Sequence, residues 1–326
     1  MNKSKCALYY CGAWGEGFDK IPDRALNCLD ILYYSNAAVT KDSVIFNNPA
    51  EADTVEILHK RKHGLPVVLS LVGFEDCVSN KSDCIDAAKR ACNAALDKGF
   101  DGIDLDWEFP TNEQKEMHTL LLKTFREELG KDRIVSVAVP GTNWVFDITE
   151  LISSHIYLDY INIMTYDIYS ERKITSHHCA PKSAAMSPFP CAGLEDNIVL
   201  FKEKGIPAEK LIGGVAFYSR IWHNVSSERD GLFAKTDNCA DYGPKFCDLT
   251  SEFIKNGNFS LYRDESAGGA PYLWNGSDFI TFDDEISVYE KCNIIKKYNA
   301  GGLMAWEYAC DTKENTLLRL MRNGLQ

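Results

Sequence analysis

Residues 100–110 form a largely apolar run in which every second residue from position 104 to position 108 is acidic. In an extended strand, alternate side chains share one face. Asp104, Asp106 and Glu108 should therefore form a single column, while the apolar residues between them point the other way. Carboxylates on one strand face repel one another, which raises at least one pKa and keeps a protonated acid available near neutral pH. The run therefore predicts a chemical site on a buried strand.

A solvated edge strand with its polar face in water is the alternative for this run. The opposite face, however, is wholly apolar, and Gly102 and Pro110 bound the segment. Both features are typical of a buried parallel strand, which we therefore favour.

The whole chain alternates short β-branched or aromatic segments with longer amphipathic ones, the pattern of repeated βα units. Helices are expected at 50–62, 82–98, 112–129 and 194–204, with Ser82 as an N-cap and Gly205 as a helix stop. Strands are expected at 6–10, 29–35, 66–72, 101–107, 133–139, 159–166, 210–217 and 301–306. Eight units predict an α/β fold of the (β/α)₈ TIM-barrel type, with catalytic residues where strands end. A doubly wound sheet is the alternative, but it leaves the last strand without a role.

The regular alternation fails at about residues 222–283. This segment has no clear helix, is rich in glycine, aspartate and aromatic residues, and contains Cys239 and Cys247. We interpret it as a small α+β insertion after the seventh strand. No linker, low-complexity tract or internal repeat divides the chain, so residues 1–326 are expected to form a single catalytic barrel domain.

Composition excludes some partners. The chain of 326 residues has a formal net charge of −12, whereas nucleic-acid binding needs a basic surface. No segment approaches the roughly 20 consecutive apolar residues of a membrane-spanning helix. We therefore expect neither nucleic acid nor membrane as a partner, and a monomer that binds a neutral ligand such as a sugar.

The chain contains twelve cysteines but no Cys-x-x-Cys pair. The cluster His177-His178-Cys179 could bind a metal, but adjacent residues of a strand point to opposite faces. We therefore predict no metal site and no cofactor. Short separations favour three disulfide bonds: Cys77–Cys84, Cys179–Cys191 and Cys239–Cys247.

Cysteine content and glycosylation sequons together bear on cellular location. Many cysteines, together with five Asn-x-Ser sequons, are typical of a secreted glycoprotein. The sequons begin at Asn2, Asn80, Asn224, Asn258 and Asn275. Residues 1–5 lack the apolar stretch of a signal peptide, so we expect a secreted extracellular protein whose leader has been removed. The alternative is a cytosolic enzyme with twelve free thiols.

Several motifs resemble one family. Residues 101–108 are similar to the Asp-x-x-Asp-x-Asp-x-Glu signature of glycoside hydrolase family 18, the chitinases. The resemblance extends from about residue 5 to residue 311, and the insertion resembles a shortened form of one found in a branch of this family. Three further segments match the family's motifs: Met164-Thr165-Tyr166-Asp167, Phe217-Tyr218-Ser219-Arg220, and Gly301 to Trp306.

The third strand departs from the family pattern. Residues 70–74 resemble Ser-x-Gly-Gly-Trp, but Val72 replaces a glycine and Phe74 replaces the tryptophan that stacks on the leaving sugar. Ser70 is retained. Together with Tyr9 on the first strand, it is expected to hydrogen-bond Asp104.

The resemblance implies a retaining, substrate-assisted glycosidase, an exception to the two-carboxylate scheme. Glu108 would protonate the glycosidic oxygen, and the acetamido carbonyl of the sugar would attack the anomeric carbon. Asp106 and Tyr166 would then stabilise the oxazolinium ion, and Asp104 would share charge with Asp106. Substrate contacts are implied for a second set of residues: Tyr9, Ser70, Phe74, Met164, Asp167, Tyr218, Arg220 and Trp306.

The implied activity is endo-hydrolysis of β-1,4-linked N-acetylglucosamine polymers, with chitin and chito-oligosaccharides as ligands and no cofactor. Two alternatives stay open. A chitin-binding lectin on the same barrel typically lacks the glutamate found here as Glu108. An endo-β-N-acetylglucosaminidase acting on N-glycan cores needs little of the aromatic floor that Trp306 and Tyr218 provide.

Overall fold

The computed structural model describes residues 4–12, 17–190, 193–249, 253–254 and 257–326. Within these residues, eight parallel strands close into a barrel, because β1 pairs with both β14 and β2. The strands are β1 (Lys5–Cys11), β2 (Ile31–Val39), β4 (Val67–Val72), β5 (Gly102–Leu105), β6 (Ile134–Pro140), β7 (Tyr160–Met164), β8 (Leu211–Ala216) and β14 (Gly302–Trp306). The closed ring confirms the predicted TIM barrel. The doubly wound alternative is wrong, since an open sheet leaves its edge strands unpaired.

The predicted strands agree closely with the observed ones. The acidic strand β5 ends at Leu105, two residues earlier than predicted, although the N–H of Asp106 still donates to the Leu71 carbonyl at 2.9 Å. Gly102 at its start lies so close to β6 that a Cβ atom would stand 2.2 Å from the Ile134 carbonyl oxygen. Only glycine allows this approach, which brings β5 and β6 into register.

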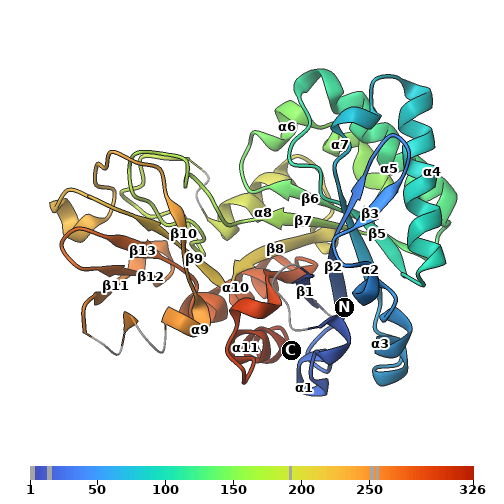
Figure 1. Ribbon diagram of the computed structural model, residues 1–326. Coiled ribbons are helices and arrows are strands. Elements are labelled where there is room, and N and C mark those ends of the chain that lie inside the picture. The colour runs from blue at the N-terminus through green and yellow to red at the C-terminus, as the bar shows by residue number, and fades with distance from the viewer. Residues whose placement is uncertain (1–3, 13–16, 191–192, 250–252, 255–256) are drawn as a thin grey trace.

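Helices cover the outside of the barrel (Figure 1), with α4 beside α5 on one flank and α10 beside α11 near the chain ends. They are α1 (Asp23–Leu26), α2 (Pro49–Ala52), α3 (Val55–Arg61), α4 (Lys81–Asp97), α5 (Lys115–Leu129), α6 (Val145–Ile148), α7 (Leu151–Ser154), α8 (Leu194–Glu203), α10 (Glu285–Tyr298) and α11 (Thr316–Gly324). In the part of the chain that the structure describes, none is long and apolar enough to cross a membrane.

Local capping explains where the helices differ from prediction. Asn80, rather than Ser82, caps α4, and its side chain accepts the Asp83 N–H at 3.0 Å. The predicted helix 50–62 divides into α2 and α3 because the hydroxyl of Thr54 donates to the Glu51 carbonyl and ends the first helix. Gly205 follows α8 with a φ of 88°, as expected of a helix stop.

The insertion forms a five-stranded antiparallel sheet beside the barrel (Figure 1). It begins at Tyr218, four residues before the predicted start, and includes one short helix, α9 (Phe246–Asp248). An apolar cluster that contains Trp222, Tyr272 and Trp274 gives this sheet a core of its own. Its strands are β9 (Tyr218–Trp222), β10 (Asp241–Lys245), β11 (Ser260–Asp264), β12 (Ala270–Trp274) and β13 (Phe279–Thr281), while β3 (Val44–Phe46) is a separate strand paired with β2.

A buried ion pair joins the end of the insertion to the barrel. The Lys291 ammonium on α10 lies 2.6 Å from the Asp283 carboxylate, and both side chains are almost fully buried. Lys291 also donates to the Gly214 carbonyl on β8 at 3.1 Å, and Asp283 accepts the Ala216 N–H at 3.1 Å. The pair therefore holds the return of the chain against β8.

Two of the predicted disulfide bonds are wrong. Cys77, Cys84 and Cys239 are free thiols. The sulfur of Cys77 faces the Val39 carbonyl and that of Cys84 faces the Met117 carbonyl, so a short sequence separation does not bring the two sulfurs together. Cys179 is also a thiol, and its expected partner Cys191 lies outside the described residues. The secreted location therefore depends on the sequons alone and stays a prediction.

The buried ion pair predicts a large effect of one substitution. Lys291→Met should lower the free energy of unfolding by about 3–5 kcal/mol, because it leaves the Asp283 carboxylate buried without its partner. Lys297→Met, on the same helix, removes an exposed pair with Glu195 and should cost less than about 1 kcal/mol. Urea denaturation of both variants measures the difference; equal losses would contradict the structural role of Lys291.

Candidate active site

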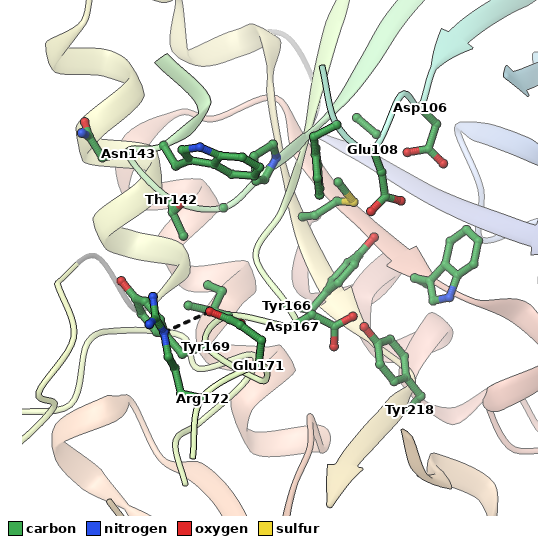
Figure 2. A pocket seen from close by; sticks show the side chains of 18 of the residues that line it. Asp106, Glu108, Thr142, Asn143, Tyr166, Asp167, Tyr169, Glu171, Arg172 and Tyr218 are labelled. Carbon is green, nitrogen blue, oxygen red and sulfur yellow. Dashed lines mark ion pairs between the residues drawn. The ribbon is translucent and has the colours of Figure 1, made fainter. Parts of the chain in front are cut away.

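A cavity of about 1020 Å³ opens at the carboxyl ends of the barrel strands, where the fold predicts chemistry. Figure 2 shows its labelled residues around a common space. Its volume is slightly above the range typical of ligand sites, about 300–1,000 Å³. Of the residues predicted from sequence, these line it: Tyr9, Asp106, Glu108, Met164, Tyr166, Asp167, Tyr218 and Trp306.

The acidic column descends from the cavity into the barrel. Glu108 is exposed to the cavity, Asp106 is 7% exposed, and Asp104 is completely buried. Trp107 points away and packs between Phe74 and His118, as alternation along the strand predicts. The three carboxyl groups therefore differ in environment although they follow one another at the end of β5.

Four hydrogen bonds hold the buried carboxylate of Asp104. Tyr9 donates at 2.8 Å and Ser70 at 3.3 Å, as predicted, while Ser136 donates at 2.6 Å and the Asn162 amide at 3.1 Å. Burial nevertheless raises the pKa of Asp104, because these four donors only partly offset the loss of water.

Sequence reasoning missed Ser136 and Asn162. Ser70, Asp104 and Ser136 lie side by side on β4, β5 and β6 in the strand register. Polar residues inside neighbouring apolar strands were the available signal. Pairing the predicted strands would have placed Ser70, Asp104 and Ser136 at one level, whereas Asn162 is level with Ala138, two residues further along β6.

Asp106 has an environment that opposes ionisation. Burial raises its pKa well above the ordinary value, repulsion from Glu108 and Asp104 adds to this, and a hydrogen bond from Ser70 opposes it. Among the described residues, its Oδ1 atom is buried without a hydrogen-bond partner. The pKa of Glu108 is also raised, by burial and then by the charge of Asp167. The column therefore retains a proton at a pH where an ordinary carboxyl group has lost it.

Tyr166 faces the acid across the cavity. Its hydroxyl and the Glu108 carboxyl group point toward one another in Figure 2. Burial, followed by the charges of Asp106 and Glu108, raises the pKa of Tyr166 well above its usual value. The phenol therefore stays neutral and can donate a hydrogen bond to a ligand.

Asp167 is held as a fixed anion. Arg220 donates to both of its carboxylate oxygens, at 2.6 and 2.7 Å, and Nδ1 of His178 lies 3.4 Å from one of them. Burial raises the pKa of Asp167, but the Arg220 and His178 interactions outweigh it and hold the pKa below the ordinary value. Its φ of 56° is uncommon for a residue other than glycine and typical of functional sites.

Three residues that were predicted to contact the substrate do not line the cavity. Phe74 is completely buried against Trp107 and Phe125, so it cannot stack on a sugar as the resemblance implied. Ser70 is also buried and supports Asp104 from below the cavity. Arg220 does not line the cavity; it binds Asp167 and lies over the Tyr242 ring at 3.6 Å.

Aromatic residues form much of the cavity wall. Trp306 lines it as predicted, and Trp144, which sequence reasoning missed, is 45% exposed and packs edge to face on Phe109 at 5.2 Å. Phe109 directly follows the acid. Exposed rings of this kind offer apolar faces for the C–H bonds of a sugar.

The histidine side chains contact carboxylates and do not form a metal site with other described residues. His177 lies 3.2 Å from Asp264 of the insertion, and His178 faces Asp167. In the described part of the chain, no group of three histidine, cysteine or acidic side chains is arranged to hold a metal ion.

The profile of one family, glycosyl hydrolases family 18, matches residues 7–311. The chain belongs to this family. Chitinase A1 of Niallia circulans is 32% identical over 273 residues, which cover 72% of this chain and 38% of the relative. Chitotriosidase-1 of Mus musculus is 30% identical over 255 residues, covering 72% of this chain and 54% of the relative. The chain thus spans less than two thirds of either relative.

Solved structures also resemble this chain, and one of them matches it over almost the full length of both proteins. It is described as a glycoside hydrolase family 18 N-acetylglucosaminidase from Paenibacillus barengoltzii. It superimposes with a TM-score of 0.92 and 29% sequence identity, covering 98% of this chain and 99% of that one. The chain therefore has the fold of a family 18 glycoside hydrolase.

The raised pKa of Asp106 predicts a pH-dependent stability effect. Between the unfolded-state pKa of about 3.9 and the higher pKa of the folded state, this group lowers the free energy of unfolding by about 1.4 kcal/mol for each pH unit, and above the folded-state pKa the cost is constant. Asp106→Asn should therefore raise the free energy of unfolding at pH 7, and the gain should vanish below about pH 3.9, where both states carry the proton. Urea denaturation at both pH values tests this; destabilisation at pH 7 would contradict it.

Proposed function

We propose that this protein is an endo-acting hydrolase of β-1,4-linked N-acetylglucosamine polymers, chitin and its oligosaccharides, with a retaining, substrate-assisted mechanism. The observation that carries the proposal is the position of Glu108. It opens into the cavity with a raised pKa, and Asp106 lies two residues before it, just after the end of β5. Family membership supports the same reaction class.

Glu108 acts first as the general acid, giving its proton to the glycosidic oxygen as the bond breaks. Asp106 is poorly placed to attack the anomeric carbon, because it approaches from the same strand face as the acid. The acetamido carbonyl oxygen of the sugar forms the new bond to that carbon instead and gives an oxazolinium ion. Glu108, now ionised, takes a proton from the water that opens this ring.

Asp106 and Tyr166 orient the acetamido group during these steps. Asp106 lines the cavity, and its carboxyl group can turn toward a ligand and accept the acetamido N–H, because its buried Oδ1 has no hydrogen-bond partner among the described residues to hold it in place. The neutral phenol of Tyr166 can donate to the carbonyl oxygen. Asp104 lies beneath Asp106, and its charge and hydrogen bonds govern how readily Asp106 gains or loses a proton.

The cavity wall supports an extended sugar ligand. Trp306, Tyr218 and Trp144 line a cavity that continues past the acid to Arg172 (Figure 2). This length favours endo-hydrolysis, and the aromatic wall favours chitin over the N-glycan core. Glu108 argues against a lectin. Release of single N-acetylglucosamine units is a second candidate, because the solved structure with a TM-score of 0.92 is described as an N-acetylglucosaminidase.

Removal of the acid gives the first test. Glu108→Gln should reduce kcat on a chitin hexamer by about 10²- to 10⁴-fold, because the amide keeps the shape but delivers no proton. Oligosaccharide binding, measured by calorimetry, should persist. Glu116→Gln, an exposed acid on α5, is the matched control and should keep wild-type turnover. If the Glu108 variant retained more than about a tenth of wild-type kcat, Glu108 would not be the acid.

Substrate assistance gives the second test. Chitin oligomers should be cleaved with a β anomer as the first product, whereas fully deacetylated oligomers of equal length should not be cleaved, since they lack the acetamido nucleophile. NMR of the first-formed products measures both. An initial α anomer, or rapid cleavage of glucosamine oligomers, would refute the mechanism. Product lengths in the same digest distinguish endo-hydrolysis from release of single sugars.

A further inference from the structure

A second cavity lies next to the catalytic one and is lined by cations. Its volume is about 760 Å³, and the two cavities share Arg172. Lys173 and Lys235 also line it, whereas Asp237 is the acidic residue in its lining. In a chain with a formal net charge of −12, three cations around one hollow are unusual, and a concave surface concentrates their potential.

Hydrogen bonds hold the segments that form this second cavity. Ile174 pairs with Lys235 in an antiparallel bridge, and the Thr236 N–H donates to the Lys173 carbonyl at 3.2 Å. The indole N–H of Trp222 binds the Arg172 carbonyl at 3.0 Å. The backbone that carries the cations is therefore fixed before any ligand arrives.

The polar groups of the cavity are only partly satisfied within the protein. Arg172 pairs with Glu171 at 3.2 Å, but neither Lys173 nor Lys235 forms an ion pair with a described residue. The hydroxyl oxygen of Ser226, which also contributes to the lining, is buried without a hydrogen-bond partner among those residues. Cations and a hydroxyl group that line one hollow without a partner among the described residues are suited to bind an anionic group.

The position of the second cavity links it to the bound polymer. Figure 2 shows Arg172 and Tyr169 on the side of the catalytic cavity away from Asp106. Tyr169 lines the catalytic cavity and stacks at 4.2 Å on Phe189, which lines the second one. The ring pair therefore joins the lining of the catalytic cavity to the lining of the cavity that contains Lys173 and Lys235.

We propose that the second cavity binds an anionic substituent, a carboxylate or a sulfate or phosphate ester, carried by a polymer whose N-acetylglucosamine units occupy the catalytic cavity. The proposal rests on the proposed function and extends its substrate class to N-acetylglucosamine polymers that carry acidic substituents. Binding by cations at a partly exposed site should be sensitive to ionic strength.

Calorimetry with two ligands of equal length tests the proposal, in the Glu108→Gln protein so that no cleavage occurs. The probes are a neutral chitin hexamer and the same hexamer bearing O-sulfate groups. The sulfated probe should bind more tightly at low salt. Adding Lys173→Gln and Lys235→Gln together should weaken its binding about three- to tenfold, from typical energies of exposed ion pairs, and leave the neutral probe unchanged.

Lys131→Gln is the matched control, because Lys131 is exposed just before β6, at the opposite end of the barrel from the catalytic cavity. It should change neither affinity. Equal affinities for the two probes, or a preference for the sulfated probe that survives in the double lysine variant, would overturn the proposal. Hydrolysis of neutral oligomers by the wild-type protein tests the proposed function separately, so failure of one is distinguishable from failure of the other.

Discussion

The buried carboxylate of Asp104 is the constraint around which the site is organised. A carboxylate without water is costly unless donors surround it, and here the donors come from four different strands: Tyr9 on β1, Ser70 on β4, Ser136 on β6 and Asn162 on β7. The hydrogen bonds that offset the cost of burying Asp104 also fix the register of the barrel strands at this level. Asp106 and Glu108 follow Asp104 closely in the chain, so the position of Asp104 also fixes theirs.

Two opposite electrostatic environments meet in the cavity. Burial and mutual repulsion raise the pKa values of Asp106 and Glu108, whereas Arg220 and His178 outweigh the burial of Asp167 and lower its pKa. When the environments of two acidic groups separate their pKa values, the difference indicates which group acts as the acid and which as the base. Asp167 in turn adds to the raised pKa of Glu108. The fixed anion thus helps to keep the acid protonated.

Sequence was most informative where a short-range pattern has a single structural outcome. Alternation along residues 100–110 was enough to place Asp104, Asp106 and Glu108, and the βα rhythm was enough for the barrel. A short-range pattern does not predict contacts between side chains on different strands. Ser136 and Asn162 were missed for this reason. The role of Phe74 was misjudged because a motif position does not reveal whether its side chain faces the cavity or the surrounding helices. Cysteine spacing failed for a similar reason, since bond formation depends on where Cys77 and Cys84 point.

The insertion contributes to the site although it lies outside the barrel. Arg220, which holds Asp167 as an anion, belongs to β9 of the inserted sheet, and His177 joins the loop after β7 to Asp264 on β11. The ion pair between Lys291 and Asp283 secures the other end of the insertion against β8. Both ends of the inserted sheet are therefore tied to the barrel. A displacement of this sheet would move Arg220 away from Asp167 and remove the positive charge that offsets this anion near Glu108. The inserted sheet therefore contributes to the electrostatic environment of the barrel site.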